Sequence, residues 1–198
     1  MAHSASERSS SCLCRPVSSR VFRITAAVLS IVLSSSSLLS ETRKPTEYEV
    51  KAAYLYNFGK FIKWPPAAAS VDPSFAICVF GPDPFGTSLD GLTAGESLDG
   101  KRLAVRRITS TDEAQKCRIL FISRSEQGRA SSILNAVKRL PILTVSDMPN
   151  FLENGGVISF VMQGDRVRFE VSLPAAERAG LSLSSELLKV AVSVKRET

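Results

Sequence analysis

Residues 75–80 read Phe75-Ala76-Ile77-Cys78-Val79-Phe80, a run without one charged side chain, and it stops at the turn sequence Gly81-Pro82-Asp83-Pro84. A short run that is apolar at every position is typical of a central strand in a sheet that is covered on both faces. Residues 119–122, ILFI, repeat the pattern. We therefore expect two buried strands that pair inside one sheet.

Helical and extended segments alternate around these two runs. Short helices are predicted at 85–92 and 126–139, and strands at 103–108 and 141–145. Such alternation indicates βαβ units and a mainly parallel sheet. Two β-rich runs, 157–162 and 167–171, flank a short turn and predict a hairpin of antiparallel edge strands, and closing helices are predicted at 173–179 and 184–194. The expected fold class is α/β: a single-domain sandwich with a mainly parallel mixed sheet, helices on both faces and a C-terminal β-hairpin, over residues 41–198.

A longer helix is predicted ahead of the first strand. Thr46-Glu47-Tyr48-Glu49 has the pattern of a capping box, with Thr46 as the N-cap and Glu49 reaching back to it. The residues at helical spacing behind it are Val50, Ala53, Tyr54, Asn57, Phe58, Phe61 and Ile62. We expect these to form the buried face, and Trp64-Pro65-Pro66 to end the helix.

The first forty residues differ from the rest of the chain. Four arginines precede an apolar, serine-rich run at residues 24–39, which predicts a secretory signal peptide over residues 1–40, cleaved between about 36 and 44. An uncleaved membrane anchor is the alternative. Removal of the leader would lower Lys+Arg from 25 to 21 and Asp+Glu from 19 to 18, so the net charge would fall from +6 to about +3. The basic character is then mostly that of the leader, and we expect no nucleic-acid partner.

The end of the predicted signal peptide also separates the histidine and two of the cysteines from the rest of the chain. The single histidine, His3, and two cysteines, Cys12 and Cys14, lie in the leader. A mature chain without histidine has no Ser-His or Cys-His pair and lacks the commonest zinc ligand. Cys78 and Cys117 remain, and in an exported chain they predict a disulfide that closes a loop of about 40 residues. Two buried free thiols are the alternative.

Few residues are candidates for catalysis or ligand binding. The turn Gly81–Gly86 stands where a phosphate-binding loop would lie, but its two prolines remove backbone donors, so a structural turn is favoured. Asp147 follows a predicted strand at the sheet edge where α/β proteins bind ligands, although a helix cap is the simpler role. Arg106 and its neighbour Arg107 form either a basic surface or a solvated face. No nucleophile stands beside a base, and we expect no catalytic residue, no metal and no cofactor.

Several stretches resemble one family of proteins in order along the chain. They are residues 51–65 (KAAYLYNFGKFIKWP), 77–79, 85–86, 117–123 (CRILFIS), 143–147 (LTVSD), 155–158, 167–171 and 179–188. This pattern resembles the YfiR-like periplasmic regulatory proteins. The resemblance implies a periplasmic homodimer that binds the periplasmic sensor domain of an inner-membrane diguanylate cyclase, or another sensor protein, and represses it. Cyclic di-GMP signalling and biofilm formation would then fall.

The same resemblance bears on the two cysteines outside the leader. Cys78 and Cys117 match a cysteine pair that is oxidised in the family, which implies a redox-sensitive disulfide; a second pair found in some relatives is absent here. Tyr56 and Trp64 lie off the predicted helical face and, with Arg106 and Asp147, are the expected partner-binding residues. For the two aromatic residues, packing under the closing helices is the alternative. Two other functions stay open: a periplasmic small-ligand-binding accessory protein of a sensor kinase or transporter, and a flavodoxin-like enzyme with a nucleotide or flavin at the Gly81–Gly86 turn.

Overall fold

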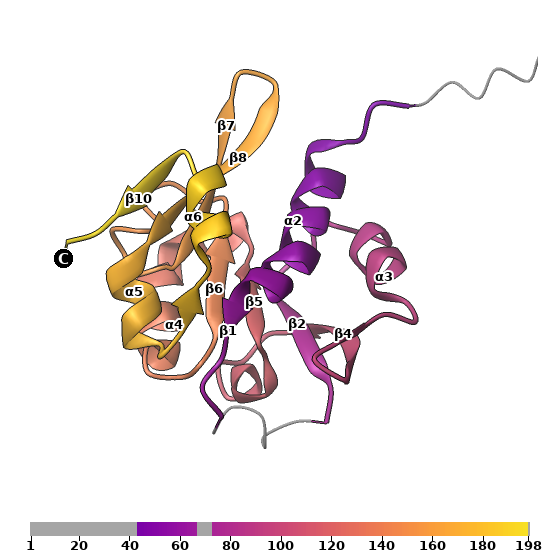
Figure 1. Ribbon diagram of the computed structural model, residues 1–198, viewed down its shortest axis with the longest axis horizontal. Helices are drawn as coiled ribbons and strands as arrows, with labels where there is room; N and C mark the ends of the chain where they lie inside the picture. Colours follow the sequence, from indigo (N-terminus) through magenta and orange to yellow (C-terminus); the bar gives the residue numbers. More distant parts are fainter. Residues whose placement is uncertain (1–42, 67–72, 198) are drawn as a thin grey trace, which may run out of the picture. The chain divides into compact units, whose positions relative to one another are not determined.

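An eight-stranded mixed sheet organises the part of the chain that the computed structural model describes, residues 43–66 and 73–197 (Figure 1). The strand order is β10-β8-β7-β6-β5-β2-β4-β3. The predicted signal peptide, and with it the alternative of an anchor, lies outside the described residues. Within the described ranges, no helix is long and apolar enough to cross a membrane.

Parallel strands form the centre of the sheet. β2 (Phe75–Phe80) lies between β4 (Lys101–Ile108) and β5 (Ile119–Ile122), and β6 (Leu143–Ser146) follows β5. Every residue of β2, β5 and β6 is buried, because helices cover both faces of these strands. The two central strands predicted from apolar runs are confirmed at their predicted bounds.

The predicted hairpin is also confirmed, but it does not form the edge of the sheet. β7 (Ile158–Gln163) and β8 (Arg166–Ser172) pair antiparallel, and β10 (Ser193–Lys195) adds a parallel strand outside β8. At the other edge β3 (Ser97–Leu98) pairs antiparallel with β4. A separate small ladder joins β1 (Ile62–Lys63) to β9 (Ser182–Leu183).

The closing helix predicted over residues 184–194 is therefore too long. α6 (Ser185–Val190) stops after six residues, and the chain then turns into β10. The backbone N–H of Val192 donates to the carbonyl of Phe169, and Val194 pairs with Val171. The apolar spacing of this segment suits both states, and the open backbone edge of β8 supplies the partners that decide between them.

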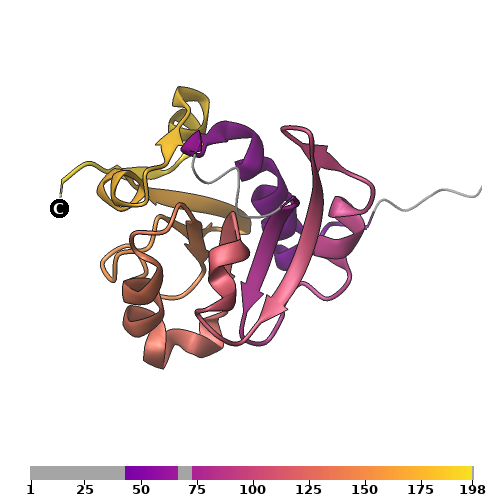
Figure 2. The same cartoon turned by 90° about the horizontal axis from the view of Figure 1, so that it is seen from below.

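Helices cover both faces of the sheet, as predicted (Figures 1 and 2). The core on one face includes side chains from α2 (Glu47–Phe61), α3 (Ser88–Thr93), α5 (Leu173–Arg178) and α6. The core on the other face includes side chains from α4 (Ala130–Val137) and from the 3₁₀ segment η2 (Glu113–Lys116). The helix predicted at 126–139 is divided, because the 3₁₀ segment η3 (Arg124–Arg129) precedes α4. The predicted α/β sandwich with a mainly parallel mixed sheet is confirmed.

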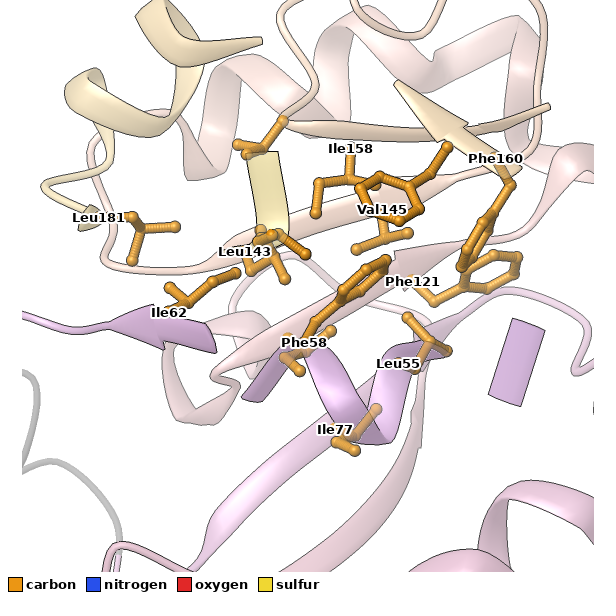
Figure 3. Packing of buried hydrophobic residues seen from close by; sticks show 14 of the residues in the cluster. Leu55, Phe58, Ile62, Ile77, Phe121, Leu143, Val145, Ile158, Phe160 and Leu181 are labelled. Atoms are coloured by element: carbon orange, nitrogen blue, oxygen red, sulfur yellow. The ribbon is translucent and has the colours of Figure 1, made fainter. Parts of the chain in front are cut away.

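Helix α2 begins as predicted, with a complete capping box at Thr46 and Glu49. Its buried face matches the predicted one only in part: Phe58 and Ile62 are buried as predicted, but the helix is turned by about one residue. The residues of α2 that are buried are Lys51, Ala52, Leu55, Phe58 and Gly59. In Figure 3, Leu55 and Phe58 point at Phe121 and Val145 of the sheet. Gly59 contributes to this rotation, because a Cβ there would collide with Leu98 and press on Phe75. Phe61, predicted to be buried, is 39% exposed.

Candidate functional site

A disulfide joins Cys78 to Cys117, as predicted, with 5.8 Å between the Cα atoms. Cys78 is the middle of β2, and Cys117 stands between η2 and β5. Both residues are almost fully buried in the core on the α4 face of the sheet. The bridge therefore fixes the η2 segment to the central strand.

A polar cluster lies on the opposite face, where β6 ends. Asp147, the residue after β6, accepts hydrogen bonds at Oδ2 from Lys51 Nζ at 2.5 Å and from Tyr48 Oη at 2.9 Å. Lys51 Nζ also donates to Glu47 Oε1 at 2.5 Å. Because Glu47, Tyr48 and Lys51 belong to the first turns of α2, the capping box that starts this helix also places the cluster.

Burial makes this cluster electrostatically unusual. The side chains of Lys51 and Asp147 are only 3% and 7% exposed. A buried ammonium is tolerated only when carboxylates pair with it, and here two of them do. Burial, and then the hydrogen bond to Asp147, raise the pKa of Tyr48 from its ordinary value of 10.0 to about 12, so the phenol stays protonated and serves as a donor.

One atom of the cluster has no partner. Asp147 Oδ1 is buried and receives no hydrogen bond; in the described residues only Trp64 Nε1 shares this state. Beside Asp147 lies a cavity of about 430 Å³. It opens where β6 ends, since β7 pairs with β6 only up to Ser159 and then continues to Gln163 alongside β8 (Figure 1). This is the carboxyl edge of a parallel sheet, where α/β proteins commonly bind ligands.

The four residues expected to bind a partner do not come together. Tyr56 Oη donates to Glu96 Oε2 at 2.9 Å, just before β3. Trp64 packs edge-on against Phe75, with 5.2 Å between ring centroids. Both aromatic residues are only partly buried against the core.

Arg106 and Asp147 lie on different parts of the sheet. Arg106 stands on β4, with Nη2 3.3 Å from Ser74 Oγ. Asp147 belongs to the cluster at the end of β6, and the backbone turn there is held by Ser146 instead, whose Oγ accepts from Met148 N–H. Tyr56, Trp64 and Arg106 are thus near the β3–β4 edge, and Asp147 is not with them.

The Gly81–Gly86 turn is filled by the protein's own side chains. Asp83 Oδ1 accepts from the N–H of Phe85 at 2.7 Å, and Asp83 Oδ2 accepts from Arg107 Nε at 2.8 Å. Gly81 has a φ of +86°, and a Cβ there would collide with the carboxylate of Glu126. These contacts favour the interpretation as a structural turn and disfavour a phosphate-binding loop.

An apolar groove between α2 and α6 was missed from the sequence. It encloses about 410 Å³, and its lining residues are Tyr54, Asn57, Phe58, Phe61, Phe169, Glu186, Leu187 and Val190. Phe61 and Val190 are 39% and 56% exposed at its rim. The signal was present, because Tyr54, Asn57 and Phe61 belong to the helical stripe that periodicity assigned to the core. Periodicity detects an apolar face and does not say what covers it.

Comparisons with known proteins give a family and a distant fold neighbour. The family model described as YfiR/HmsC-like matches residues 48–192. No curated protein sequence matches the chain. A crystal structure of a conserved domain protein from Vibrio cholerae O1 biovar El Tor is similar with a TM-score of 0.51 and 13% identity, over 76% of this chain and 60% of that one. The chain thus spans 60% of the length of that neighbour, and the likeness concerns the fold alone.

A second solved structure is less similar. The ABC domain of Streptococcus pneumonia in complex with L-Trp has a TM-score of 0.44 and 11% identity, over 61% of this chain and 55% of that one. A likeness at this level adds nothing on fold or function.

Proposed function

The chain belongs to the YfiR/HmsC-like family, and from this premise we propose that it binds the periplasmic sensor domain of a membrane-bound diguanylate cyclase and holds the cyclase inactive. Family membership supports a periplasmic regulator in general, and the match over residues 48–192 is the observation that carries the proposal. The proposal includes export of the chain by the leader at residues 1–40, with cleavage between about 36 and 44. Lower cyclic di-GMP output is the expected consequence.

The proposed mechanism is repression by binding. A regulator of this kind changes an enzyme only by binding one of its states more tightly than the other. A hundredfold preference for the inactive state corresponds to a coupling free energy of roughly 2.7 kcal/mol. The Cys78–Cys117 bridge would keep the sheet in the shape that binds, and its reduction would weaken repression. Because both cysteines are buried, we expect reductants to reach them only when the η2 segment opens.

We assign the contact with the partner to the groove between α2 and α6. Phe61 and Val190 expose apolar surface there, and apolar and aromatic side chains at the centre of a contact usually supply most of its binding energy. Tyr56, Trp64 and Arg106, near the β3–β4 edge, are the second candidate surface. A homodimer is also proposed, and one of these surfaces would then join the two copies.

The first experiment measures cyclic di-GMP in the native host after deletion of the gene and after its restoration. We expect a rise on deletion that wild type reverses and that Cys78→Ser/Cys117→Ser does not. Phe61→Glu/Val190→Glu should also fail to reverse it, whereas Tyr56→Ala/Trp64→Ala should succeed. Unchanged cyclic di-GMP on deletion would rule out the cyclase as the target.

Two controls separate loss of contact from loss of fold or of dimer. The thermal melting temperature of Phe61→Glu/Val190→Glu should stay near that of wild type, whereas the cysteine variant and Tyr56→Ala/Trp64→Ala, which lose the bridge and the packing on Phe75, should melt lower but stay folded at the growth temperature. Light scattering on wild type and on Phe61→Glu/Val190→Glu reports the oligomeric state. A dimer that becomes a monomer in the variant would assign the groove to the contact between copies and leave the β3–β4 edge for the partner.

A second function is favoured by one specific observation. The cavity of about 430 Å³ beside Asp147, at the carboxyl edge of the sheet, supports a small-ligand-binding accessory protein of a sensor kinase or transporter. Thermal stabilisation by a soluble compound, together with unchanged cyclic di-GMP on deletion, would favour this function over repression.

A further inference from the structure

The β7–β8 hairpin extends beyond the strand next to it. β6 pairs with β7 only at Ile158 and Ser159, whereas β7 stays paired with β8 as far as Gln163. Figure 1 shows the hairpin standing out from the end of the sheet. Among the described residues, no strand lies beside residues 160–163 on the side where β6 has ended. This stretch of β7 is therefore an open strand edge.

The backbone of Met162 faces out of this edge. In an antiparallel pair of strands, only every second pair of opposite residues exchanges backbone hydrogen bonds. The N–H of Ser172 donates to the carbonyl of Val157, so along the same register residues 161 and 163 are the ones bonded to β8. The N–H and C=O of Met162 then point away from β8, and they have no backbone partner in the part of the chain that the structure describes.

This edge lacks the protection that open strand edges normally have. Natural sheets place charged residues, above all lysine, or proline at their edges, which hinders pairing with other chains. β10 ends at Lys195, and β8 has Arg166 and Arg168 in the stretch that β10 leaves unpaired. Residues 160–163 read FVMQ, without a charge or a proline, and Met162 is 48% exposed. Such an edge is suited to pairing with another extended chain.

The cavity of about 430 Å³ lies along the same edge. Its lining includes Phe160 and Met162, whose side chains lie on one face of the hairpin, and Val161 and Glu170, whose side chains lie on the other. A cavity that both faces border runs past the edge where they meet. Residues 147–153, which follow β6, also line it. The cavity therefore lies where a continuation of β6 would pair with β7.

The two faces of the edge specify the side chains of the occupant. Side chains of a strand alternate between the two faces of a sheet. A strand added beside β7 would place every second side chain next to Phe160 and Met162, on the face toward α2, and the others next to Val161 and Glu170. The carboxylate of Glu170 favours a basic side chain on its face. The matching segment is extended and has apolar and basic residues in alternation.

We propose that residues 160–163 bind an extended peptide segment of a partner protein by strand addition, with apolar and basic side chains alternating along that segment. Main-chain hydrogen bonds to Met162 supply affinity, and the alternate side chains supply selectivity. The lining of this cavity shares no residue with the groove between α2 and α6. The inference thus goes beyond the contact proposed above and does not rest on repression of a cyclase.

The test is an NMR titration of the ¹⁵N-labelled protein, produced from the full chain, with a synthetic peptide. The peptide has eight residues, alternately lysine and valine, and is acetylated and amidated at its ends. We expect saturable shifts at the amides of residues 147–153 and 160–163. At saturation, hydrogen exchange of the Met162 amide should slow about tenfold or more, because this N–H gains an acceptor.

Two control peptides separate strand addition from other kinds of contact. The same sequence with every backbone nitrogen methylated keeps the side chains and has no donors, so it should give no saturable shifts. A peptide with glutamate in place of lysine should bind about threefold more weakly or worse at low ionic strength. No saturable binding of the lysine peptide, unchanged exchange at Met162, or equal binding of either control peptide would overturn the proposal.

A pair of proline variants locates the added strand. Met162→Pro removes the N–H that faces the cavity and no bond to β8, and should weaken peptide binding about tenfold or more. Val167→Pro is the matched control, because Val167 lies opposite Met162 and its N–H faces the other edge of the hairpin. The carbonyl of Phe169 shows that orientation, since it accepts from Val192 outside β8. Val167→Pro should leave peptide binding within about twofold of wild type.

Equal losses in the two proline variants would mean that binding needs only an intact hairpin, and would also overturn the proposal. If Met162→Pro fails to fold, the methylated peptide tests the same hydrogen bonds on the wild-type protein. Peptide binding is measured on the protein alone, whereas repression is measured as cyclic di-GMP in the host. A chain that binds no peptide and still lowers cyclic di-GMP would refute the inference and leave the proposed function standing.

Discussion

On each face of the central sheet a covalent or buried ionic link holds a covering segment to a strand, and the two links differ in kind. On the α4 face the Cys78–Cys117 bridge fixes η2 to β2. On the α2 face the Lys51–Asp147 ion pair fixes α2 to the end of β6. A bridge stabilises the fold mainly by restricting the unfolded chain, and it leaves no polar atom exposed to a new partner. A buried ion pair is costly to form, and here it leaves Asp147 Oδ1 without a donor.

That difference separates a structural link from a candidate binding site. The sulfur atoms are buried among apolar side chains, including Ala76, Phe80 and Leu120. The ion pair instead borders a cavity at the carboxyl edge of the sheet. We therefore expect changes at the cysteines to alter stability most, and changes at Asp147 to alter both stability and ligand binding.

The largest effect is expected from removal of the bridge. Cys78→Ala/Cys117→Ala should lower the free energy of unfolding by about 4 kcal/mol, the chain-entropy value for a loop closed between residues 39 apart. Urea unfolding followed by circular dichroism measures it. Reduced wild type should unfold near the same urea concentration as the variant. A loss below about 1 kcal/mol would show that the α4 face is held by packing alone.

Breaking the ion pair on one side should have the next largest effect. Lys51→Met leaves the carboxylate of Asp147 buried without its cation and should cost about 3 kcal/mol in the free energy of unfolding. Lys51→Met/Asp147→Asn removes both charges and should recover more than half of that loss. The matched control, Lys63→Met, changes an exposed lysine of β1 and should cost less than about 0.5 kcal/mol. Equal losses at Lys51 and Lys63 would contradict a buried, structurally important pair.

Tyr48→Phe tests whether the stabilisation that the Tyr48 hydroxyl gives to the Lys51–Asp147 cluster depends on pH. Loss of the hydroxyl that donates to Asp147 should cost about 1 kcal/mol at neutral pH. The pKa of Tyr48 is raised in the folded state from 10.0 to about 12, so the contribution of the hydroxyl is complete below pH 10 and disappears as the pH rises through 12. Unfolding of wild type and variant at pH 8 and pH 11.5 measures the gap between them, which should shrink. A gap that stays constant between these two pH values would refute the assignment.

The smallest effect is expected from an exposed ion pair. Arg107 donates to Asp90 and Asp83 near the Gly81–Gly86 turn, but its own side chain is 38% exposed. Arg107→Met should therefore cost less than about 1 kcal/mol, and less again in 0.5 M salt. The hydrogen bond to Arg107 lowers the pKa of Asp90, so this small contribution is present at neutral pH and is lost as the pH falls through the lowered pKa. A cost as large as that of Lys51→Met would erase the distinction between buried and exposed pairs.

Much of the fold could be predicted from the sequence, because its signals are local. The bounds of β2 and β5 follow from unbroken apolar runs, and the start of α2 follows from the capping box at Thr46 and Glu49. The hairpin of β7 and β8 follows from two β-rich runs around a short turn. The bridge between Cys78 and Cys117 follows from the two cysteines that remain after the predicted leader, and the family from the order of its motifs.

Only part of the candidate site could be predicted from local signals in the sequence. Asp147 was selected because it follows a strand, and the structure places it at the expected edge of the sheet. Lys51 was not selected, because a lysine within an amphipathic helix normally faces water. Its partner is 96 residues away in the sequence, and no local pattern reports such a distance.

What the sequence determined by itself, then, was the identity of the elements: the apolar strands, the capped helix, the hairpin and the pair of cysteines. Only the tertiary structure decided how α2 is turned, since Gly59 lets it approach Leu98 and Phe75 and the carboxylates accept Lys51. It also decided that residues 193–195 form a strand, because the edge of β8 offers backbone partners. The physical reason is common to both cases. Periodicity and capping depend on neighbours within a few residues, whereas burial, ion pairing and edge pairing depend on groups that only the completed sheet brings together.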